Sequence, residues 1–231
     1  MKKSSLAEKA YIASKLIRIR PVIAWSVTSF VLVLSAGIRD GLSPDYTLAL
    51  LSLLMVAIMQ GLSSHAINDI ADEKVDRSAD MKGTGRHKLL VAGEITKRGM
   101  STIFVISLIV SLIICAYIYS VRGIIILAVM SAGVFFIYSY NFKPLKLNYR
   151  PFAEFTTVFP VIISMSLCFS YSIFGGISNS IIYVAVVNAF MNMSWYHFSR
   201  LQDIKPDMIN RKVTSLVWVY ENFGRRMENV F

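Results

Sequence analysis

A dense acidic segment is the first group of residues in this sequence that could do chemistry. Asn68, Asp72 and Asp76 are spaced i, i+4 and i+8, so on a helix they share one face, with Asp69 one turn away. Like charges on one face repel and call for a compensating cation. Oxygen ligands at this density suit Mg²⁺, which proteins commonly hold through one or two carboxylates plus substrate phosphates. The alternative is a solvated acidic helix end.

A second acidic pair follows far along the chain. Asp203 and Asp207 also have i, i+4 spacing, provided that Pro206 lies in the first turn of its helix or in a tolerated kink. Two acidic segments at one depth could each hold a Mg²⁺ ion, and a diphosphate could bridge them. The second pair therefore favours a metal site over a solvated helix end for the first segment.

Basic residues surround both acidic segments. Arg86 and Lys88 follow the first, Arg211 and Lys212 follow the second, and Lys143 stands between them in the chain. Their charges could neutralise a departing diphosphate. Each of them, taken alone, could equally be a surface charge that sets membrane topology.

Aromatic residues close two apolar stretches of the sequence. They are Phe135, Phe136, Tyr138 and Tyr140 in one, and Trp195, Tyr196 and Phe198 in the other. The aromatic belt at a membrane interface explains most of them. One ring could instead stabilise an allylic carbocation through its π-face after a diphosphate leaves. We take Tyr138, above the Lys143 loop, as the candidate for this role.

The elements that must position these residues are membrane-spanning helices. Of 231 residues, 55% are hydrophobic and only 16% charged, whereas soluble domains carry roughly 25% charged residues. A helix needs about 20 apolar residues to cross the hydrocarbon layer, and the apolar runs here lack the alternation of a barrel strand. We identify six such runs: Val22–Ile38, Tyr46–Ile67, Thr102–Ser120, Gly123–Tyr140, Phe152–Phe174 and Ile181–Phe198. The sequence thus predicts an all-α, polytopic membrane helical bundle with six transmembrane helices.

Basic residues alternate between rich and poor segments along the chain. Lys and Arg are frequent before the first run, in the second and fourth gaps and after the sixth run, whereas the other gaps hold at most one. By the positive-inside rule, the N-terminus and both acidic segments face the cytoplasm of a multi-pass cell-membrane protein. Topology and attraction to anionic lipid explain the formal net charge of +10, so no nucleic-acid partner is expected.

Other kinds of site leave no signature in the sequence. Cys115 and Cys168 lie inside apolar runs, where cysteine acts as a small hydrophobic residue. We find no Cys/His metal cluster, no Gly-rich phosphate loop and no Ser/His/Asp pattern.

Four segments, in this order, resemble the UbiA superfamily of intramembrane prenyltransferases. Asn68–Asp76 matches the family's first signature, N-D-x-x-D-x-x-x-D, and Asp203–Asp207 matches a D-x-x-x-D form of its second. Leu89–Ile95 is similar to the segment after the first signature. Tyr138-Ser139 followed by Pro144-Leu145-Lys146 is similar to the family's fourth-loop segment.

The resemblance implies a fold, a reaction and a set of site residues. The fold would be one prenyltransferase-like membrane domain over residues 1–231, with a central cavity open sideways to lipid. The reaction would be Mg²⁺-dependent transfer of a polyprenyl group from its diphosphate to a small acceptor in the bilayer. The implied Mg²⁺–diphosphate ligands are Asn68, Asp72, Asp76, Asp203 and Asp207. Asp69 also matches a motif position, and Arg86 or Lys88, together with Lys143, would contact the diphosphate.

Two features bear on the acceptor. The stretch Gly83–Arg86 is similar to the menaquinone-pathway branch, which prenylates dihydroxynaphthoate, so an aromatic quinone precursor is the expected acceptor. Ser199–Gln202, before the second signature, departs from the pattern of that branch. Archaeal members that alkylate a glycerol phosphate ether therefore remain an alternative.

The family has more spans than the six found here. We therefore expect the sequence to be incomplete at its C-terminal end, with the remaining spans in a longer or separate C-terminal half. An inactive, truncated remnant is the corresponding alternative.

Two other classes of membrane protein compete with this interpretation. An ion-coupled transporter would carry acidic residues near the bilayer midplane, whereas these acids lie at span ends. A CDP-alcohol phosphotransferase would show a D-G-x-x-A-R motif, which is absent from the sequence.

Overall fold

The computed structural model describes residues 15–80 and 88–224. Every regular element in these ranges is helical, which confirms the predicted all-α class. The α-helices are α2 (Ile19–Pro21), α3 (Thr28–Arg39), α4 (Tyr46–Ile58), α5 (His65–Ala71), α6 (Glu73–Asp80), α7 (Lys97–Arg122), α8 (Ile124–Asn141), α9 (Phe159–Phe174), α10 (Asn179–Arg200), α11 (Ile204–Ile209) and α12 (Ser215–Phe223). Two 3₁₀ turns are η3 (Leu147–Tyr149) and η5 (Leu201–Asp203).

Five helical segments of the described chain are long and apolar enough to cross a membrane. They are Ile19–Arg39, Tyr46–Ala71, Lys97–Arg122, Ile124–Asn141 and Glu154–Phe174. The expected count of six is not confirmed, because α10 is outside this set. Although α10 has 22 residues, polar side chains such as Asn188 and Asn192 lower its hydropathy. The fifth segment also begins with a carboxylate, Glu154, which lies inside the fifth apolar run of the sequence.

Three of these segments are continuous helices that contain π-helical turns. The π-helical turns are η1 (Val22–Val27), η2 (Met59–Ser64) and η4 (Glu154–Val158). Each lies in the half of its helix nearer the acidic residues, and such turns are frequent at functional sites. Each π-helical turn also contains one buried side-chain oxygen that has no hydrogen-bond partner. These oxygens belong to Ser26, Gln60 and Thr157.

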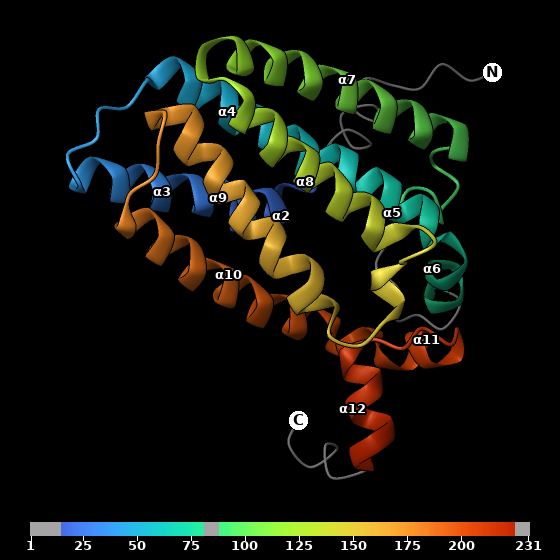
Figure 1. Ribbon diagram of the computed structural model, residues 1–231. Coiled ribbons are helices and arrows are strands. Elements are labelled where there is room, and N and C mark those ends of the chain that lie inside the picture. The colour runs from blue at the N-terminus through green and yellow to red at the C-terminus, as the bar shows by residue number, and fades with distance from the viewer. Residues whose placement is uncertain (1–14, 81–87, 225–231) are drawn as a thin grey trace.

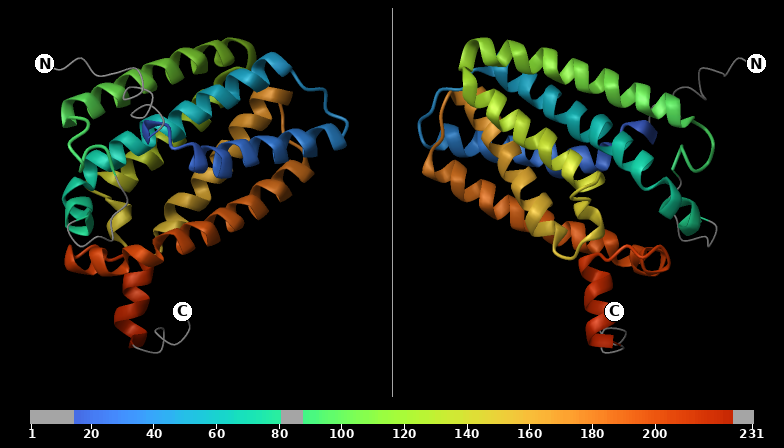
Figure 2. Two further views of the ribbon diagram at one scale, coloured as in Figure 1. Left: turned by 180° about the vertical axis from the view of Figure 1, so that it is seen from behind. Right: turned by 45° about the vertical axis from the view of Figure 1, so that its right-hand side comes forward.

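The long helices pack side by side, and α9 lies at the centre of the bundle. It contacts α3, α4, α8 and α10, whereas α7 lies outermost, against α4, α5 and α8 (Figure 1). The loops after α3, α7 and α9 gather at one end of the bundle. At the opposite end, α6, α11 and the loop after α8 come together, and α12 projects away from them (Figures 1 and 2).

The core is apolar near the α9 C-terminus and polar between some helices. Phe169 and Ile173 are fully buried in a cluster that includes Val33, Met55 and Ile118. Asn188 donates a 2.7 Å hydrogen bond to Ser29 across α10 and α3, and the hydroxyls of Ser63 and Ser107 are 2.7 Å apart. Such interhelical bonds and close-packed small residues hold helices together in lipid, where apolar burial gives little preference.

One close approach sets the distance between the first two spans. Gly61, in η2, is buried, and a Cβ added there would lie 2.5 Å from Cγ2 of Val22 in η1. Val22 is β-branched and stiff at χ1, so it cannot move aside easily. The backbones of η1 and η2 can approach this closely only because residue 61 has no side chain.

We therefore expect Gly61→Ala to destabilise the folded protein by about 1–3 kcal/mol, the usual cost of overpacking. The measurement is the thermal unfolding midpoint in detergent. Gly133→Ala in α8 is the matched control, because nothing lies within 4 Å of a Cβ there and alanine is the better helix former. Equal midpoints for Gly61→Ala and wild type would contradict the proposed close approach.

Candidate functional site

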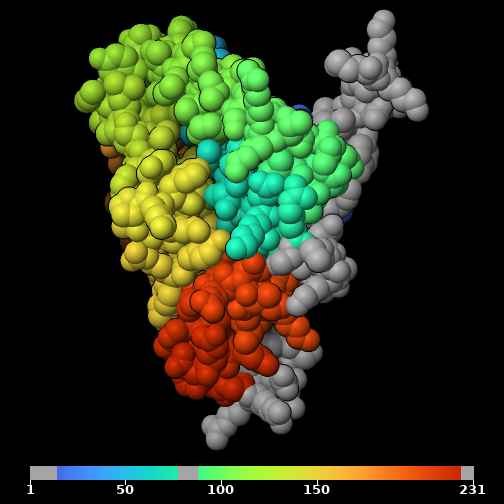
Figure 3. Space-filling model, turned by 90° about the vertical axis from the view of Figure 1, so that its right-hand side faces the viewer, coloured from blue at the N-terminus to red at the C-terminus, as the bar shows by residue number. Residues whose placement is uncertain are grey.

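The fold brings the two acidic segments together. Helix α6, which follows Asp72, contacts α11, which carries Asp207. Asp72 is 4% exposed and Asp207 is 3% exposed. Asp72 and Asp207, which are 135 positions apart in the sequence, thus share one buried polar region. Figure 3 shows the surface of the C-terminal segment with α11 directly against that of the segment with α6.

Local backbone geometry explains how the first segment presents its polar groups. The α5 helix ends at Ala71 and α6 begins at Glu73, with Asp72 as a bend between them. The helical hydrogen bonds nevertheless continue through the bend, because Asp72 N–H donates to Asn68 O and Asp76 N–H to Asp72 O, each at 2.9 Å. The side-chain amide of Asn68 accordingly lies 3.5 Å from Asp72 Oδ2.

The second segment is a short helix that tolerates its proline. Pro206 is the third residue of α11, in the first turn, where no backbone N–H bond is required. Asp207 follows it and points inward. Asp203 lies at the end of η5, half-buried, and its charge is close enough to raise the pKa of Asp207.

One network of alternating charges involves the first segment alone. Arg18 donates to both carboxylate oxygens of Asp69, at 2.6 and 2.7 Å. Lys88 Nζ lies 3.2 Å from Asp69 Oδ1 and 2.6 Å from Asp76 Oδ2. Burial raises the pKa of Asp76, against the opposing charge of Lys88. The predicted residues Asp69, Asp76 and Lys88 therefore meet, with Arg18 as an unpredicted fourth member.

A second network joins the two segments. Lys212 Nζ donates to Asp72 Oδ2 at 2.9 Å and lies 4.0 Å from Asp207 Oδ1. Asn148 also donates to both oxygens of Asp72, at 3.2 and 3.4 Å. Arg200 Nη1 is 3.8 Å from Asp207 Oδ2. These contacts hold Asp72 and Asp207 on either side of one ammonium group.

The two carboxyls in this network have opposite pKa shifts. Burial raises the pKa of Asp72, but the charge and hydrogen bond of Lys212 outweigh it, so the pKa is lowered. Burial raises the pKa of Asp207 to about 6, because its cations, Lys212 and Arg200, are farther away. Asp207 thus lacks the close cation that Asp72 has.

A polar chain extends from this network into the bundle. Arg200 donates a short hydrogen bond to the hydroxyl of Tyr140, which lies 2.6 Å from the hydroxyl of Tyr196. The Arg200 guanidinium also lies over the Tyr196 ring, 4.8 Å from its centroid. Asn141, also on α8, accepts from Asn68 at 3.0 Å. The C-terminal end of α8 therefore supplies polar partners to Asn68 of the first segment and to Arg200, which lies beside Asp207.

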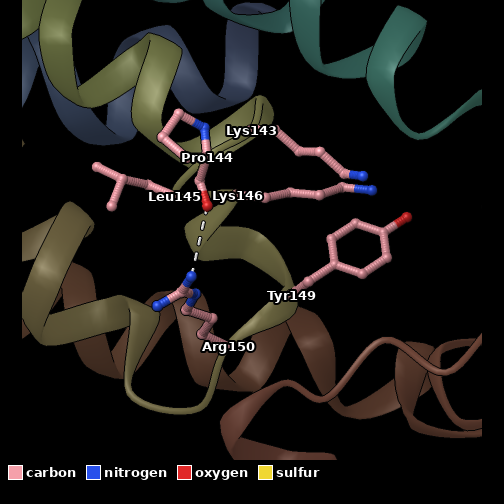
Figure 4. Close-up of a pocket in the computed structure, with 6 residues that line it drawn as sticks. All are labelled: Lys143, Pro144, Leu145, Lys146, Tyr149 and Arg150. Carbon is pink, nitrogen blue, oxygen red and sulfur yellow. Dashed lines mark hydrogen bonds between the residues drawn. The ribbon is translucent and has the colours of Figure 1, made fainter.

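The loop after α8 forms a basic hollow beside the acidic residues. Lys143, Pro144, Leu145, Lys146, Tyr149 and Arg150 line a space of about 640 Å³. Figure 4 shows the side chains of Lys143, Lys146 and Tyr149 extending to the same side of the loop. Arg150 turns the other way and donates to the Pro144 carbonyl. Lys146 Nζ lies 3.5 Å from the centre of the Tyr149 ring.

Tyr149 separates this basic hollow from the carboxylates. Burial and the nearby charges of Asp72, Asp207 and Asp76 raise the pKa of its hydroxyl to about 12. Lys212 Nζ also lies 5.3 Å from the centre of its ring. The ammonium groups of Lys146 and Lys212 thus both lie near the neutral phenol of Tyr149, and such an arrangement suits a polyanion.

Tyr138 lies elsewhere than the sequence analysis anticipated. Tyr138 is 56% exposed, and the centre of its ring is 5.3 Å from that of Phe142. It lines an apolar groove of about 490 Å³ between α7 and α8, together with residues such as Cys115 and Phe135. Tyr140 and Tyr196, on the other hand, contact Arg200 within the polar network. The cation-stabilising role of Tyr138 stays a prediction, which this placement does not strengthen.

Arg86 falls within residues 81–87, outside the described residues. Lys143 lines the basic hollow and is exposed. Arg211 is exposed as well, whereas Lys212 is 3% exposed. The basic residues named from the sequence thus divide into buried partners of the carboxylates and exposed charges of the hollow.

The donor atoms of this site fit a hard divalent cation. Groups of three or more convergent His, Cys, Asp or Glu residues are absent from the described residues. Two buried oxygens nevertheless have no hydrogen-bond partner, Asn148 Oδ1 and Asp207 Oδ2. Carboxylate and amide oxygens that lack donors are the ligands that Mg²⁺ prefers, usually completed by substrate phosphates.

Several members of the site could not be recognised from sequence. Arg18 was counted as a topology charge, and Asn141 and Asn148 belong to no spaced pattern. Tyr149 follows a loop whose basic residues were the visible signal. Glu154 is 3% exposed and accepts a 2.6 Å hydrogen bond from Ser215, which ties α12 to the start of η4.

Comparison with known proteins identifies the family and the fold of this chain. The family model described as the UbiA prenyltransferase family matches residues 24–228, and the chain belongs to that family. Two structures of a UbiA homolog from Archaeoglobus fulgidus share its fold, each with a TM-score of 0.66 over 89% of this chain and 68% of that chain. One, bound to GPP and Mg²⁺, is 21% identical, and the other, bound to DMAPP and Mg²⁺, is 23% identical. Among curated proteins no match was found.

The pairing of charges at the site leads to a test of stability. Lys88 is 14% exposed and is shared by Asp69 and Asp76, so Lys88→Gln leaves Asp76 without its closest cation. Removing one partner of a buried pair costs about 3–5 kcal/mol. We expect a clear fall in the thermal unfolding midpoint in detergent.

Lys97→Gln is the matched control for that measurement. Lys97 is 62% exposed and lies 3.7 Å from Glu73, and exposed pairs contribute about 0–1 kcal/mol. If both variants lowered the midpoint equally, the Lys88 contacts would not be the stabilising feature that the structure indicates.

Proposed function

We propose that this protein catalyses Mg²⁺-dependent transfer of a polyprenyl group from polyprenyl diphosphate to an acceptor within the membrane. The observation that carries the proposal is the meeting of Asp72 and Asp207 beside a basic hollow at one end of an apolar bundle. Membership in the prenyltransferase family supports the reaction class. The Mg²⁺ and prenyl diphosphates in the Archaeoglobus structures support the substrate and the metal.

The residues proposed to hold Mg²⁺ are Asn68, Asp72, Asp76, Asp203 and Asp207. When bound, Mg²⁺ would supply Lewis-acid neutralisation of the diphosphate. Lys143 and Lys146 would approach the diphosphate from the loop, since their side chains extend together from the hollow (Figure 4). Preorganised cations of this kind stabilise charge that develops as the diphosphate leaves.

The apolar helices contribute by excluding water. A carbocation or its equivalent, formed after the diphosphate leaves, would be captured by water to give a prenyl alcohol. The proposal includes a cavity between the helices that is open to lipid, through which a polyprenyl chain enters. Tyr138 and Tyr140 lie near the C-terminal end of α8, and Tyr196 lies near that of α10.

For the acceptor we propose an aromatic quinone precursor, of the dihydroxynaphthoate type that the menaquinone branch uses. The experiment is product analysis with a prenyl diphosphate and three acceptors, a dihydroxynaphthoate, a hydroxybenzoate and a glycerol phosphate ether. Prenylation of the glycerol ether alone would reject the aromatic acceptor and favour the ether-lipid reaction. The chain covers 68% of each Archaeoglobus chain, and the assay uses the full-length protein in lipid or detergent.

Binding of the diphosphate can be tested apart from turnover. We expect Asp72→Asn and Asp207→Asn each to weaken Mg²⁺-dependent binding of geranyl diphosphate by about tenfold or more, because a charged metal ligand is lost. Glu73→Gln is the control from the same segment, since Glu73 pairs outward with Arg77 at 3.0 Å. Wild-type affinity in both Asp variants across a Mg²⁺ titration would reject the ligand assignment.

We also propose that the acidic end of the bundle faces the cytoplasm of the cell membrane. The support is the excess of Lys and Arg at that end. Single cysteines placed at exposed Lys205 and at exposed Arg39 should be labelled by an impermeant reagent from opposite faces. Labelling of both from the same face would overturn this orientation.

A further inference from the structure

Among the described basic residues of the site, Lys212 is the most deeply buried. Its side chain is 4% exposed, and those of Asp72 and Asp207, its two carboxylate partners, are 5% and 4% exposed. An ammonium group buried this far requires paired negative charge. Lys212 and the two acidic motifs therefore depend on one another for stability.

The chain conformation around Lys212 is specialised to aim it inward. Arg211 has a φ of 55°, in the left-handed region that L-residues with a Cβ adopt only at an energetic cost. Lys212 N–H then donates to Asp207 O at 2.9 Å, closing a turn at the end of α11. The turn leaves Arg211 exposed and Lys212 buried. Strain of this kind persists where the surrounding structure fixes it, and it often marks a functional position.

The ammonium occupies the space between groups from three distant segments. Asp72 lies at the bend before α6, and its carboxylate is 2.9 Å from Lys212 Nζ. Asp207 lies in α11, and its carboxylate is 4.0 Å from the same atom. Tyr149 lies in η3, and the centre of its ring is 5.3 Å away. Asp72 and Asp207 each belong to one acidic motif. A cation that bridges the two motifs would have to lie in this same region.

We propose that Lys212 is a positioning residue that acts as an internal counter-cation, holding Asp72 and Asp207 together in the ligand-free protein and leaving Asp72 when a divalent cation binds with diphosphate. This inference rests on the proposed function for the identity of the incoming ligand. Lysine suits the task because its ammonium is a compact point charge on a flexible stem. Once displaced, the same charge is available to the incoming phosphate oxygens, beside Lys143 and Lys146.

The proposal has a consequence for metal binding without substrate. In wild type, a divalent cation alone must compete with Lys212 for Asp72, whereas a metal–diphosphate complex brings negative charge that accepts the displaced ammonium. Metal and diphosphate should therefore bind cooperatively, and Lys212 should be a source of the coupling. Removing the Lys212 charge should strengthen binding of the metal alone and weaken binding of the diphosphate.

The test uses Lys212→Gln, with Lys205→Gln as the control, because Lys205 is an exposed lysine on α11, the short helix that precedes Lys212. The probes are Mn²⁺ alone, measured by electron paramagnetic resonance in detergent, and geranyl diphosphate in saturating Mg²⁺. We expect Lys212→Gln to bind Mn²⁺ about tenfold or more tightly than wild type and geranyl diphosphate less tightly. Its thermal midpoint should be lower without metal and should recover on adding Mg²⁺.

Unchanged or weaker Mn²⁺ binding in Lys212→Gln would overturn the proposal. Lys212 would then be a structural residue that stays paired with Asp72 whether or not metal is bound. If Lys212→Gln does not fold, the same comparison is made on the Asp207→Asn background, where one negative charge fewer needs compensation. There, stronger Mn²⁺ binding on adding Lys212→Gln supports the proposal, and unchanged binding overturns it. A different result, in which wild type binds no metal even with geranyl diphosphate, would reject the proposed function itself.

Discussion

Buried negative charge is the constraint on which the rest of this structure depends. Asp69, Asp72 and Asp207 are each less than a tenth exposed, and a carboxylate removed from water must be paired or protonated. The protein meets this need with cations from outside each acidic segment, Arg18, Lys88 and Lys212. The bundle is thereby closed at one end by charge pairs, while its apolar helices are free to face lipid.

This arrangement also explains why the site is both stable and open to a ligand. Each carboxylate keeps capacity beyond its existing bonds, and Asp207 Oδ2 accepts none. A fully satisfied network would be rigid, and an unpaired one would be too costly to bury. The lysine pairings lie between these limits, because under the proposed function a flexible ammonium would exchange carboxylate oxygens for phosphate oxygens.

The acidic segments of the site could be recognised from the sequence, whereas the contacts that join them could not. The i, i+4 spacing of Asn68, Asp72 and Asp76 predicts side chains on one face, and the backbone bonds through Asp72 maintain it. Helical runs were visible from hydropathy, although α10 carries enough amide side chains to fall outside the membrane-spanning set. The separation of Tyr138 from Tyr140 depends on how α8 is rotated about its axis, with Tyr138 toward α7 and Tyr140 toward Tyr196. The apolar pattern of α8 leaves this rotation open.

Partners that lie far apart in sequence were the least predictable part of the site. Asn148, in η3, and Lys212, just after α11, both donate hydrogen bonds to Asp72. They reach it only because the folded chain places these segments beside the bend at Asp72. No spacing rule connects such residues, since their proximity follows from the tertiary arrangement. Lys212 was visible as a basic neighbour of Asp207, but its choice of Asp72 as the closer partner was not.

The distance along the chain between these partners has a consequence for biosynthesis. Asp69 can meet Arg18, which lies 51 residues earlier, as soon as the first two spans are in the membrane. Asp72 must wait for Lys212, which lies 140 residues later. At about 5–20 residues per second, that interval lasts roughly 7–28 s. During it the Asp72 carboxyl lacks its principal counter-charge, so the nascent protein must keep this end of its second helix hydrated, protonated or covered by the insertion machinery until α11 is made.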